Sequence, residues 1–293
     1  MPPLKRVLEI RKAPARHWVG DGFHVHSMFT YEDEARNFSP FLLLDFMAVA
    51  KYPPSEGDAR GVGEHPHRGF ETVTILHQGE VEHRDSAGHQ GRIGPGDVQW
   101  MTAASGVVHE EKHSREFTRK GGVLEGVQLW VNLPARLKMS APKYQDLGDS
   151  TIPAVPLPEG AGSVRVIAGS FQGRKGPAAT FTPINLWDVQ IKAGSAADLE
   201  LPDRHTLLLM VSRGRVKLND DELAGEAELA VLDRRGEQVR IEALKDSRLL
   251  LMSGEPIPEP VVGYGPFVMN SPEEIRQAIQ DYQAGKMGHL EER

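Results

Sequence analysis

Two short segments of this 293-residue chain each carry a pair of potential metal ligands separated by one residue. The first pair is His65 and His67, and the second pair is His109 and Glu111. In an extended strand, the side chains of residues i and i+2 project from the same face, roughly 7 Å apart along the backbone. If the two strands lie side by side, three imidazoles and one carboxylate converge on one small volume. We therefore predict a metal site formed by His65, His67, His109 and Glu111.

The same four side chains also have a simpler interpretation. Polar groups at strand spacing can serve as hydrogen-bonding residues at the mouth of a barrel, and one pair alone would suit a solvated strand edge. Two pairs on one face favour metal binding instead. The chain contains no cysteine, so nitrogen and oxygen must hold any metal.

Three imidazoles and a carboxylate suit several first-row divalent ions. In an octahedral sphere they leave two positions open, one for a substrate oxygen and one for dioxygen. A redox-active Fe(II) could use both positions, and Mn, Ni, Co and Zn are alternatives; the family resemblance described below implies iron.

The residues between the two pairs are typical of short strands joined by tight turns. We expect the strands at 72–76, from 81 onward and at 98–102, with turns at 77–80 and 94–97. This pattern predicts a meander within a small antiparallel barrel that carries the ligands on its inner face. Strand 126–134 alternates Val127, Leu129 and Val131 with Gln128 and Trp130, so we expect the aliphatic face to be core.

Three longer segments resemble the pirin family, whose members are proteins with two cupin barrels that bind a non-haem iron. These segments are HPHRGFETVT at 65–74, PGDVQWMTA at 95–103 and GPFVMN at 265–270. The resemblance implies an all-β fold of two cupin-type antiparallel β-barrels (a bicupin) with a short C-terminal helix. It also implies that Glu111, rather than Glu71, is the carboxylate ligand. We expect Glu71 to lie just outside the ligand set, paired with Arg68.

The resemblance implies two candidate functions. Some bacterial pirin-like proteins are similar to quercetin 2,3-dioxygenases, which open the flavonol ring with O2 and release carbon monoxide. On this hypothesis the metal binds the flavonol 3-oxygen, and Glu111 accepts the proton as a general base. Eukaryotic pirins look like transcription co-regulators, so the alternative is a metal-dependent redox-sensing regulator that binds a transcription factor or a metabolic enzyme. A storage-type or sugar-binding cupin would not need this ligand set.

Composition excludes several other classes of protein. The chain has 30 glycines and 21 prolines, which favours turns and short strands. The net charge of −7 provides no positive field for phosphate backbones, so direct nucleic-acid binding is disfavoured. Apolar runs are far shorter than the roughly 18 residues of a membrane span. We expect a cytoplasmic protein, because cysteines and a secretory signal are both missing. We also expect a monomer.

The chain divides into three expected parts. Residues 1–135 form the N-terminal metal-binding barrel, 136–257 a second barrel without metal ligands, and 258–293 an extension whose helix returns to the first barrel. Gly79-Glu-Val81 is repeated as Gly214-Arg-Val216, which indicates an internal repeat. Residues 136–257 contain only one histidine, His205, and therefore cannot build the same site. For the helix, Ser271 is the expected N-cap, with Pro272 first and Glu274 completing a capping box.

The remaining histidines and the large aromatic residues have plainer interpretations. We expect His24 and His26 on the polar face of a strand, because no third ligand follows at a suitable spacing. We interpret four further histidines near turns as solvated, namely His77, His83, His89 and His113. Three large side chains are expected to pack inside the barrel, namely Phe70, Trp100 and Met101.

Overall fold

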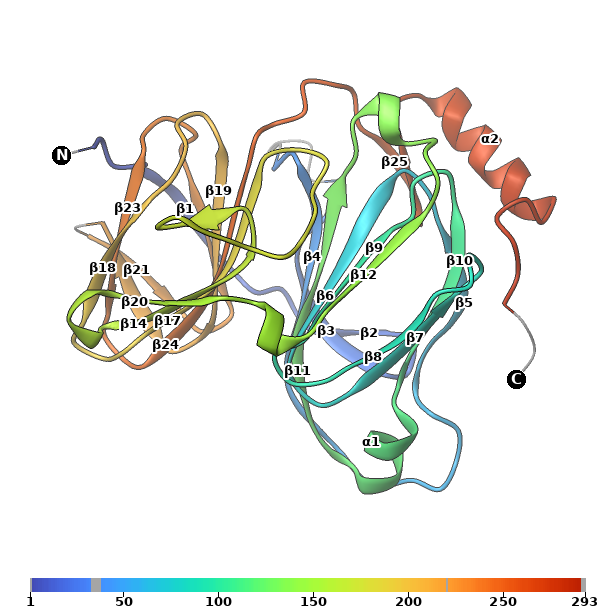
Figure 1. Ribbon diagram of the computed structural model, residues 1–293, viewed down its shortest axis with the longest axis horizontal. Coiled ribbons are helices and arrows are strands. Elements are labelled where there is room, and N and C mark those ends of the chain that lie inside the picture. The colour runs from blue at the N-terminus through green and yellow to red at the C-terminus, as the bar shows by residue number, and fades with distance from the viewer. Residues whose placement is uncertain (1, 33–37, 220, 291–293) are drawn as a thin grey trace. The chain divides into compact units, whose positions relative to one another are not determined.

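The computed structural model describes residues 2–32, 38–219 and 221–290 (Figure 1). Strands dominate these residues, which confirms the all-β expectation. They form two compact units, each built around a seven-stranded and a four-stranded antiparallel sheet. Among the described residues, the first barrel comprises 15–32, 41–149 and 257–290, and the second comprises 2–14, 38–40 and 150–256.

The first barrel contains the predicted ligand segments. Its larger sheet has the strand order β12-β9-β6-β11-β4-β3-β2 and its smaller sheet the order β5-β10-β7-β8. The strands of the larger sheet are β2 (His17–Val19), β3 (Phe23–Phe29), β4 (Phe41–Tyr52), β6 (Phe70–Gln78), β9 (Val98–Thr102), β11 (Gly122–Asn132) and β12 (Lys143–Leu147). Those of the smaller sheet are β5 (Gly61–His67), β7 (Val81–Asp85), β8 (Gln90–Ile93) and β10 (Val107–His113). Helix α1 (Arg115–Lys120) follows β10, with Ser114 as its N-cap.

The second barrel repeats this plan. Its larger sheet contains β1 (Val7–Lys12), β13 (Ala154–Pro156), β14 (Gly162–Ala168), β17 (Ile184–Ile191), β19 (Thr206–Arg213), β22 (Glu228–Leu232) and β24 (Ser247–Gly254). Its smaller sheet contains β18 (Ala196–Glu200), β20 (Arg215–Leu218), β21 (Glu222–Gly225) and β23 (Gln238–Ala243). A short hairpin of β15 (Ser170–Phe171) and β16 (Arg174–Lys175) lies outside these two sheets. Inward-facing aliphatic residues from both sheets form one continuous core.

The two barrels share the same turn from the larger to the smaller sheet. Gly79 joins β6 to β7 with a φ of 88°, and Gly214 joins β19 to β20 with a φ of 90°. Glycine adopts this left-handed region without the steric cost that a Cβ would impose. The repeated Gly-x-Val sequence therefore marks equivalent positions, as the sequence predicted.

The chain order through the sheets corrects two expectations. Strands β6 and β7 are consecutive in sequence but belong to different sheets, because β6 pairs with β9 and β11 while β7 pairs with β8 and β10. The expected meander is therefore wrong. Strand β1 pairs with β22, so the first residues belong to the second barrel and not to a unit spanning 1–135.

The end of the first barrel also differs from the expected boundary. Strand β12 pairs with β9 in the larger sheet of the first barrel, which extends this unit to residue 149 rather than 135. The sequence around β12 does not show which barrel this edge strand joins, because only its pairing with β9 assigns it to a sheet.

The C-terminal extension packs against the ligand-bearing sheet of the first barrel. Strands β25 (Val262–Tyr264) and β26 (Phe267–Met269) form a hairpin that leads into helix α2 (Pro272–Gln283), drawn in red in Figure 1. The Ser271 side chain accepts a hydrogen bond from the Glu274 amide, as the capping pattern predicted. Ile275 and Ala278 of α2 are buried in a cluster with Val108 of β10. No helix in the described part of the chain is long and apolar enough to span a membrane.

Candidate metal centre

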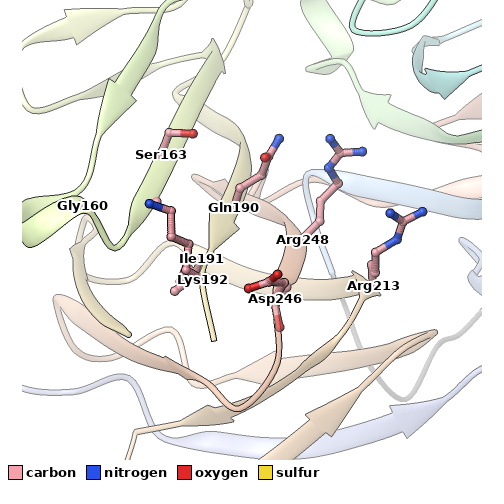
Figure 2. Close-up of a pocket in the computed structure, with 10 residues that line it drawn as sticks. Gly160, Ser163, Gln190, Ile191, Lys192, Arg213, Asp246 and Arg248 are labelled. Carbon is pink, nitrogen blue, oxygen red and sulfur yellow. The ribbon is translucent and has the colours of Figure 1, made fainter. Parts of the chain in front are cut away.

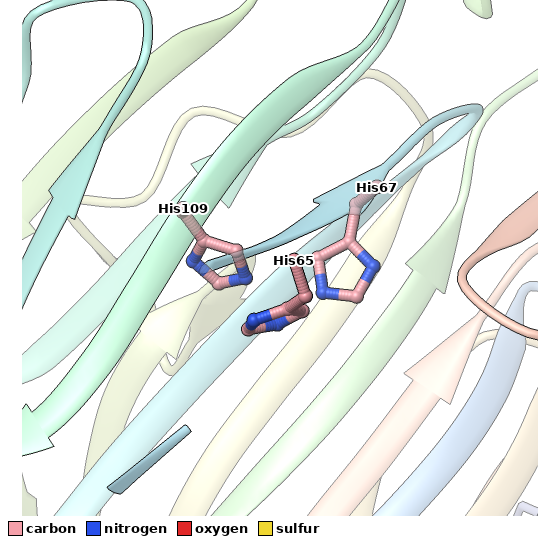
Figure 3. Close-up of side chains that lie close together, drawn as sticks. All are labelled: His65, His67 and His109. Carbon is pink, nitrogen blue, oxygen red and sulfur yellow. The ribbon is translucent and has the colours of Figure 1, made fainter. Parts of the chain in front are cut away.

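The antiparallel pairing of β5 and β10 brings the two predicted ligand segments together. His65 and His109 are direct cross-strand partners, and a bulge follows before Glu111 reaches its partner Val62. The bulge places an extra residue on β5, and such irregularities change the direction in which neighbouring side chains point. Figure 3 shows the rings of His65, His67 and His109 gathered in one place.

The three imidazoles lie at distances that a single ion can span. Their ring centroids are 4.2 Å apart for His65 and His109, 4.8 Å for His65 and His67, and 4.9 Å for His67 and His109. One nitrogen of each ring lies within 4.8 Å of a nitrogen of the other two. The geometry therefore allows all three rings to bind one metal ion after small side-chain rotations.

Hydrogen bonds leave one nitrogen of each ring facing its neighbours. His65 Nδ1 lies 2.7 Å from the carbonyl oxygen of Gly63, and His67 Nδ1 lies 3.4 Å from that of Pro266. His109 Nε2 is buried and has no hydrogen-bond partner among the described residues. A buried nitrogen without a partner is costly unless something binds it. Because carbonyl partners on the opposite nitrogen are typical of metal-bound histidines, these residues fit a metal ion.

Burial keeps two of the imidazoles neutral. Desolvation, together with the neighbouring His65, lowers the pKa of His67 well below its usual value. Desolvation and the other nearby histidines lower the pKa of His109 in the same way. Neutral imidazole is the form that binds metals, so neither ring needs to lose a proton near neutral pH.

Glu111 lies on the same strand as His109 and is held by two donors. Its Oε1 accepts a hydrogen bond from Thr74 Oγ1 at 3.2 Å, and its Oε2 accepts one from Gln128 Nε2 at 2.9 Å. The carboxylate is within ligand distance of His109 and His83, whereas His65 and His67 belong to a second group around His109. The four predicted ligands therefore form two overlapping groups that share His109, rather than one closed set.

His83 is the residue that the sequence interpretation missed. It was expected to be solvated, but it is 3% exposed and its Nδ1 lies 3.3 Å from His109 Nδ1. Its Nε2 lies 3.3 Å from Asp85 Oδ2, and its ring stacks on Tyr144. The available signal was His83-x-Asp85, a third pair at i and i+2, which strand β7 places beside β10.

Three of the candidate ligands, His65, His67 and Glu111, line a cavity of about 150 Å³ inside the first barrel. The rest of its lining is partly apolar and partly polar, and includes Phe23, Val25, Met47, Val62, Trp130, Asp45, Thr74 and Gln128. Desolvation raises the pKa of Asp45, although the Ser27 hydroxyl donates a hydrogen bond to it.

Strand β11 contributes to the cavity through the face opposite its aliphatic face. Val127, Leu129 and Val131 are fully buried, which confirms the expected core face, and Gln128 and Trp130, which alternate with them, line the cavity. The alternation identified the core face, but both faces of the strand are covered, so it did not show that the other face lines a cavity.

Glu71 and Arg68 do not form the expected pair. Glu71 is buried and accepts a hydrogen bond from Thr102 Oγ1 at 2.7 Å, and desolvation raises its pKa to about 7. Arg68 instead binds Asp281 of helix α2, with Nη1 and Oδ2 2.9 Å apart. This partner is 213 residues away in the sequence, which explains why local spacing did not reveal it.

The other side-chain predictions had mixed outcomes. His113 is buried rather than solvated, since its Nε2 lies 2.9 Å from the Gly22 carbonyl oxygen and its ring packs on Tyr52. His24 and His26 occupy the partly exposed face of β3, as expected. The three side chains assigned to barrel packing are fully buried, namely Phe70, Trp100 and Met101.

The second barrel has a larger hollow of about 520 Å³ (Figure 2), but its chemistry does not suit a metal ion. Three cationic side chains line it, namely Lys192, Arg213 and Arg248, with a single carboxylate from Asp246. These positive charges would repel a metal cation. In the described part of the second barrel, no three histidine, aspartate or glutamate side chains cluster within ligand distance. At the position equivalent to β5 and β10, strands β18 and β23 pair Ala197 with Ile241 and Leu199 with Val239.

The fold and the centre together define a class of protein, namely a double-barrel protein of the cupin type with a histidine-rich centre in one barrel. Comparison with known families agrees with this class. The pirin family model matches residues 22–131, and the model of the pirin C-terminal cupin domain matches residues 186–288. The chain belongs to the pirin family.

Individual relatives match over almost the whole chain. A Pseudomonas aeruginosa protein named "Putative quercetin 2,3-dioxygenase" is 56% identical over 283 residues, covering 97% of this chain and 98% of its own. A pirin-like protein of Caulobacter vibrioides is 40% identical, with coverage of 97% and 99%. Among solved structures, a quercetin 2,3-dioxygenase from Acinetobacter baumannii superposes with a TM-score of 0.95 at 46% identity, covering 98% of this chain and 100% of its own.

Proposed function

We propose that the chain is a metal-dependent dioxygenase that opens the ring of flavonols with O2, and that Fe(II) is its resident metal. The observation that carries this proposal is the buried His109 Nε2, which has no hydrogen-bond partner in the described part of the chain and lies close to two further imidazoles that line a cavity. The names of the Pseudomonas and Acinetobacter relatives support the choice of substrate.

His65, His67, His109 and Glu111 would hold the metal ion. Their nitrogen and oxygen donors suit Fe(II) and other first-row divalent ions, so the donor set alone does not select iron. A bound Fe(II) supplies Lewis acidity toward the flavonol 3-oxygen and a redox partner for dioxygen.

Glu111 is the proposed general base that accepts the proton of the flavonol 3-hydroxyl. Thr74 and Gln128 donate hydrogen bonds to its two oxygens, at 3.2 and 2.9 Å, and so fix the plane of the carboxylate. A carboxylate held in this way takes up a proton at a defined position without reorienting first. Gln128 and Thr74 are therefore positioning residues for this base.

The cavity suits one aromatic ring of a flavonol. A volume of about 150 Å³ is comparable to an apolar protein cavity that binds benzene. Trp130 lines the cavity and stacks on Phe70 with centroids 4.3 Å apart, which provides a flat wall for a planar substrate. Asp45 also lines the cavity and supplies a polar group that could form a hydrogen bond with a phenolic hydroxyl of the substrate.

The test is turnover of quercetin by protein loaded with Fe(II) under air. Loss of flavonol absorbance and release of carbon monoxide are followed together, and metal content is measured on the same sample. The double variant His65→Ala/His67→Ala should lose both the metal and the turnover.

The matched control is the double variant His24→Ala/His26→Ala. It removes the same His-x-His pattern from strand β3, outside the proposed ligand set, and should retain metal and turnover. The proposal is overturned if iron-loaded protein consumes quercetin no faster than the His65→Ala/His67→Ala variant does.

A further inference from the structure

A second set of side chains lies next to the candidate ligand His109. His83 of strand β7 approaches Nδ1 of the His109 ring. Asp85 of the same strand contacts His83 and His89, and Tyr144 of β12 stacks on both of these rings. The assigned ligand set and the proposed chemistry do not use these four residues.

Asp85 is held so that one of its oxygens faces His83. Its Oδ1 accepts hydrogen bonds from the backbone amides of Ala87 and His89, at 2.9 and 3.0 Å. Its Oδ2 lies 3.3 Å from His83 Nε2 and 3.1 Å from His89 Nδ1. Burial alone would raise the pKa of Asp85, but hydrogen bonds from His83 and His89 lower it overall. The carboxylate is therefore an ionised acceptor for both rings.

An ionised Asp85 fixes the donor and the acceptor in each hydrogen bond of the series from Asp85 through His83 to His109. A carboxylate can only accept, so in the neutral form of the His83 imidazole the proton lies on Nε2, which leaves Nδ1 as an acceptor. That nitrogen lies 3.3 Å from His109 Nδ1, which must then carry the proton of the His109 ring. The lone pair of His109 is left on Nε2, the buried nitrogen that has no partner among the described residues.

We propose that Asp85 and His83 form a positioning pair that sets the tautomer and orientation of His109 so that Nε2 is available to a metal ion. This inference rests on the proposed function, because it concerns a ligand of the same centre. Carboxylate or carbonyl partners commonly orient metal-bound histidines, and here a second imidazole is interposed between the carboxylate and the ligand. The Tyr144 ring stacks on the rings of His83 and His89, with centroids 5.0 and 5.7 Å away.

The Asp85→Asn substitution tests the donor and acceptor order of this hydrogen-bond series. The carbonyl oxygen of the new amide should replace Oδ1, which accepts two backbone amides, so its NH2 group should face His83. His83 Nε2 then becomes an acceptor, His83 Nδ1 a donor, and the proton of His109 moves to Nε2, where it blocks metal binding. We expect Zn(II) affinity, measured by chelator competition, to fall roughly 10- to 100-fold.

Asp97→Asn is the matched control for this experiment. Asp97 of the first barrel also accepts two backbone amides, although on different oxygens: Oδ2 accepts the Gly94 amide and Oδ1 the Asp149 amide, both at 2.8 Å. It has no hydrogen bond to a histidine in the described part of the chain, so its substitution should leave Zn(II) affinity unchanged. Urea unfolding of both variants shows whether each one folds.

The tautomers can also be read without a metal ion or any variant. Nitrogen-15 NMR of the metal-free wild-type protein should show His109 protonated on Nδ1 and His83 protonated on Nε2. The opposite assignment overturns the proposal, and this result remains readable if Asp85→Asn fails to fold.

The outcomes separate this inference from the proposed function. Wild-type protein that binds one Zn(II) with an affinity that Asp85→Asn leaves unchanged would refute the positioning pair alone. Wild-type protein that binds no Zn(II), Fe(II) or Co(II) would refute the metal site itself. Binding of two Zn(II) ions, with one lost in His83→Ala, would make His83 a ligand and overturn the positioning role.

Discussion

The ion pair between Arg68 and Asp281 joins the ligand-bearing segment to helix α2. Arg68 directly follows the candidate ligand His67, and its Nη1 lies 2.9 Å from Asp281 Oδ2. The side chains are only 5% and 11% exposed, so water does little to replace either partner. We predict that Asp281→Asn destabilises the protein and weakens metal binding at the same time.

The expected loss in the free energy of unfolding depends on which partners each residue keeps after the other is substituted. In Asp281→Asn, Arg68 keeps the carbonyl oxygen of Ser105, 2.6 Å from its Nε, but no carboxylate among its partners in the described part of the chain, so its charge stays buried without an anion. Breaking a buried pair in this way costs about 3 kcal/mol or more. In Arg68→Met, Asp281 keeps Lys286 and Gln277, each at 2.9 Å, so we expect a loss of about 1 to 2 kcal/mol.

The assay is urea unfolding of the wild type, the two single variants and the double variant. A coupling energy of about 2 kcal/mol is expected, with unchanged m-values. The exposed pair of Glu273 and Arg276 on the same helix is the control, and Glu273→Gln should leave the urea midpoint almost unchanged. A loss below about 0.5 kcal/mol for Asp281→Asn, or a coupling energy near zero, would refute the reasoning.

The remaining predictions concern three buried positions of the first barrel. Burial raises the pKa of Glu71 from 4.5 to about 7, so the folded state prefers the protonated carboxyl. The free energy of unfolding should therefore be highest below pH 4.5 and should fall by about 3 kcal/mol as the pH rises from 4.5 through 7. Urea unfolding of metal-free Glu71→Gln should therefore show higher stability than the wild type at pH 8 and equal stability at pH 4; parallel pH profiles would contradict this. Lys138→Met removes an ammonium that donates to three oxygens at 2.6 to 2.9 Å, and should cost about 3 to 5 kcal/mol; a loss under 1 kcal/mol would mean that water replaces it. Gly69→Ala forces a Cβ to within 1.9 Å of the Val268 carbonyl oxygen at a φ of 93°, and should lower the melting temperature sharply, whereas Gly63→Ala, which meets nothing within 4 Å, should not.

Much of the centre could be predicted from the sequence because its pattern is local. The side-chain period of a strand places His65 beside His67 and His109 beside Glu111, whatever the rest of the chain does. The helix start at Ser271 could be predicted for the same reason, since a cap depends on residues three positions apart. The repeated glycine turn at Gly79 and Gly214 also needs only local backbone geometry.

The errors arose where a partner lies far away in the sequence. His83 was interpreted as solvated because nothing near it in the sequence shows that β7 pairs with β10. The aliphatic face of β11 is core, as expected, but nothing local shows that Gln128 and Trp130 on its other face line a cavity. Strand β1 was assigned to the first barrel because it precedes it in the sequence, although its hydrogen bonds go to β22.

The amino-acid sequence by itself determined the family, the two ligand pairs and the strand-rich architecture, because these follow from residue identity and short spacings. Only the tertiary structure decided that the four candidate ligands form two overlapping groups around His109, and that His83, held by Asp85, lies beside it. It also placed the Pro266 carbonyl beside His67, from a segment 199 residues further along the chain. The physical reason is that strand register and the packing of distant segments set where each buried donor and acceptor points, and no local period contains that information.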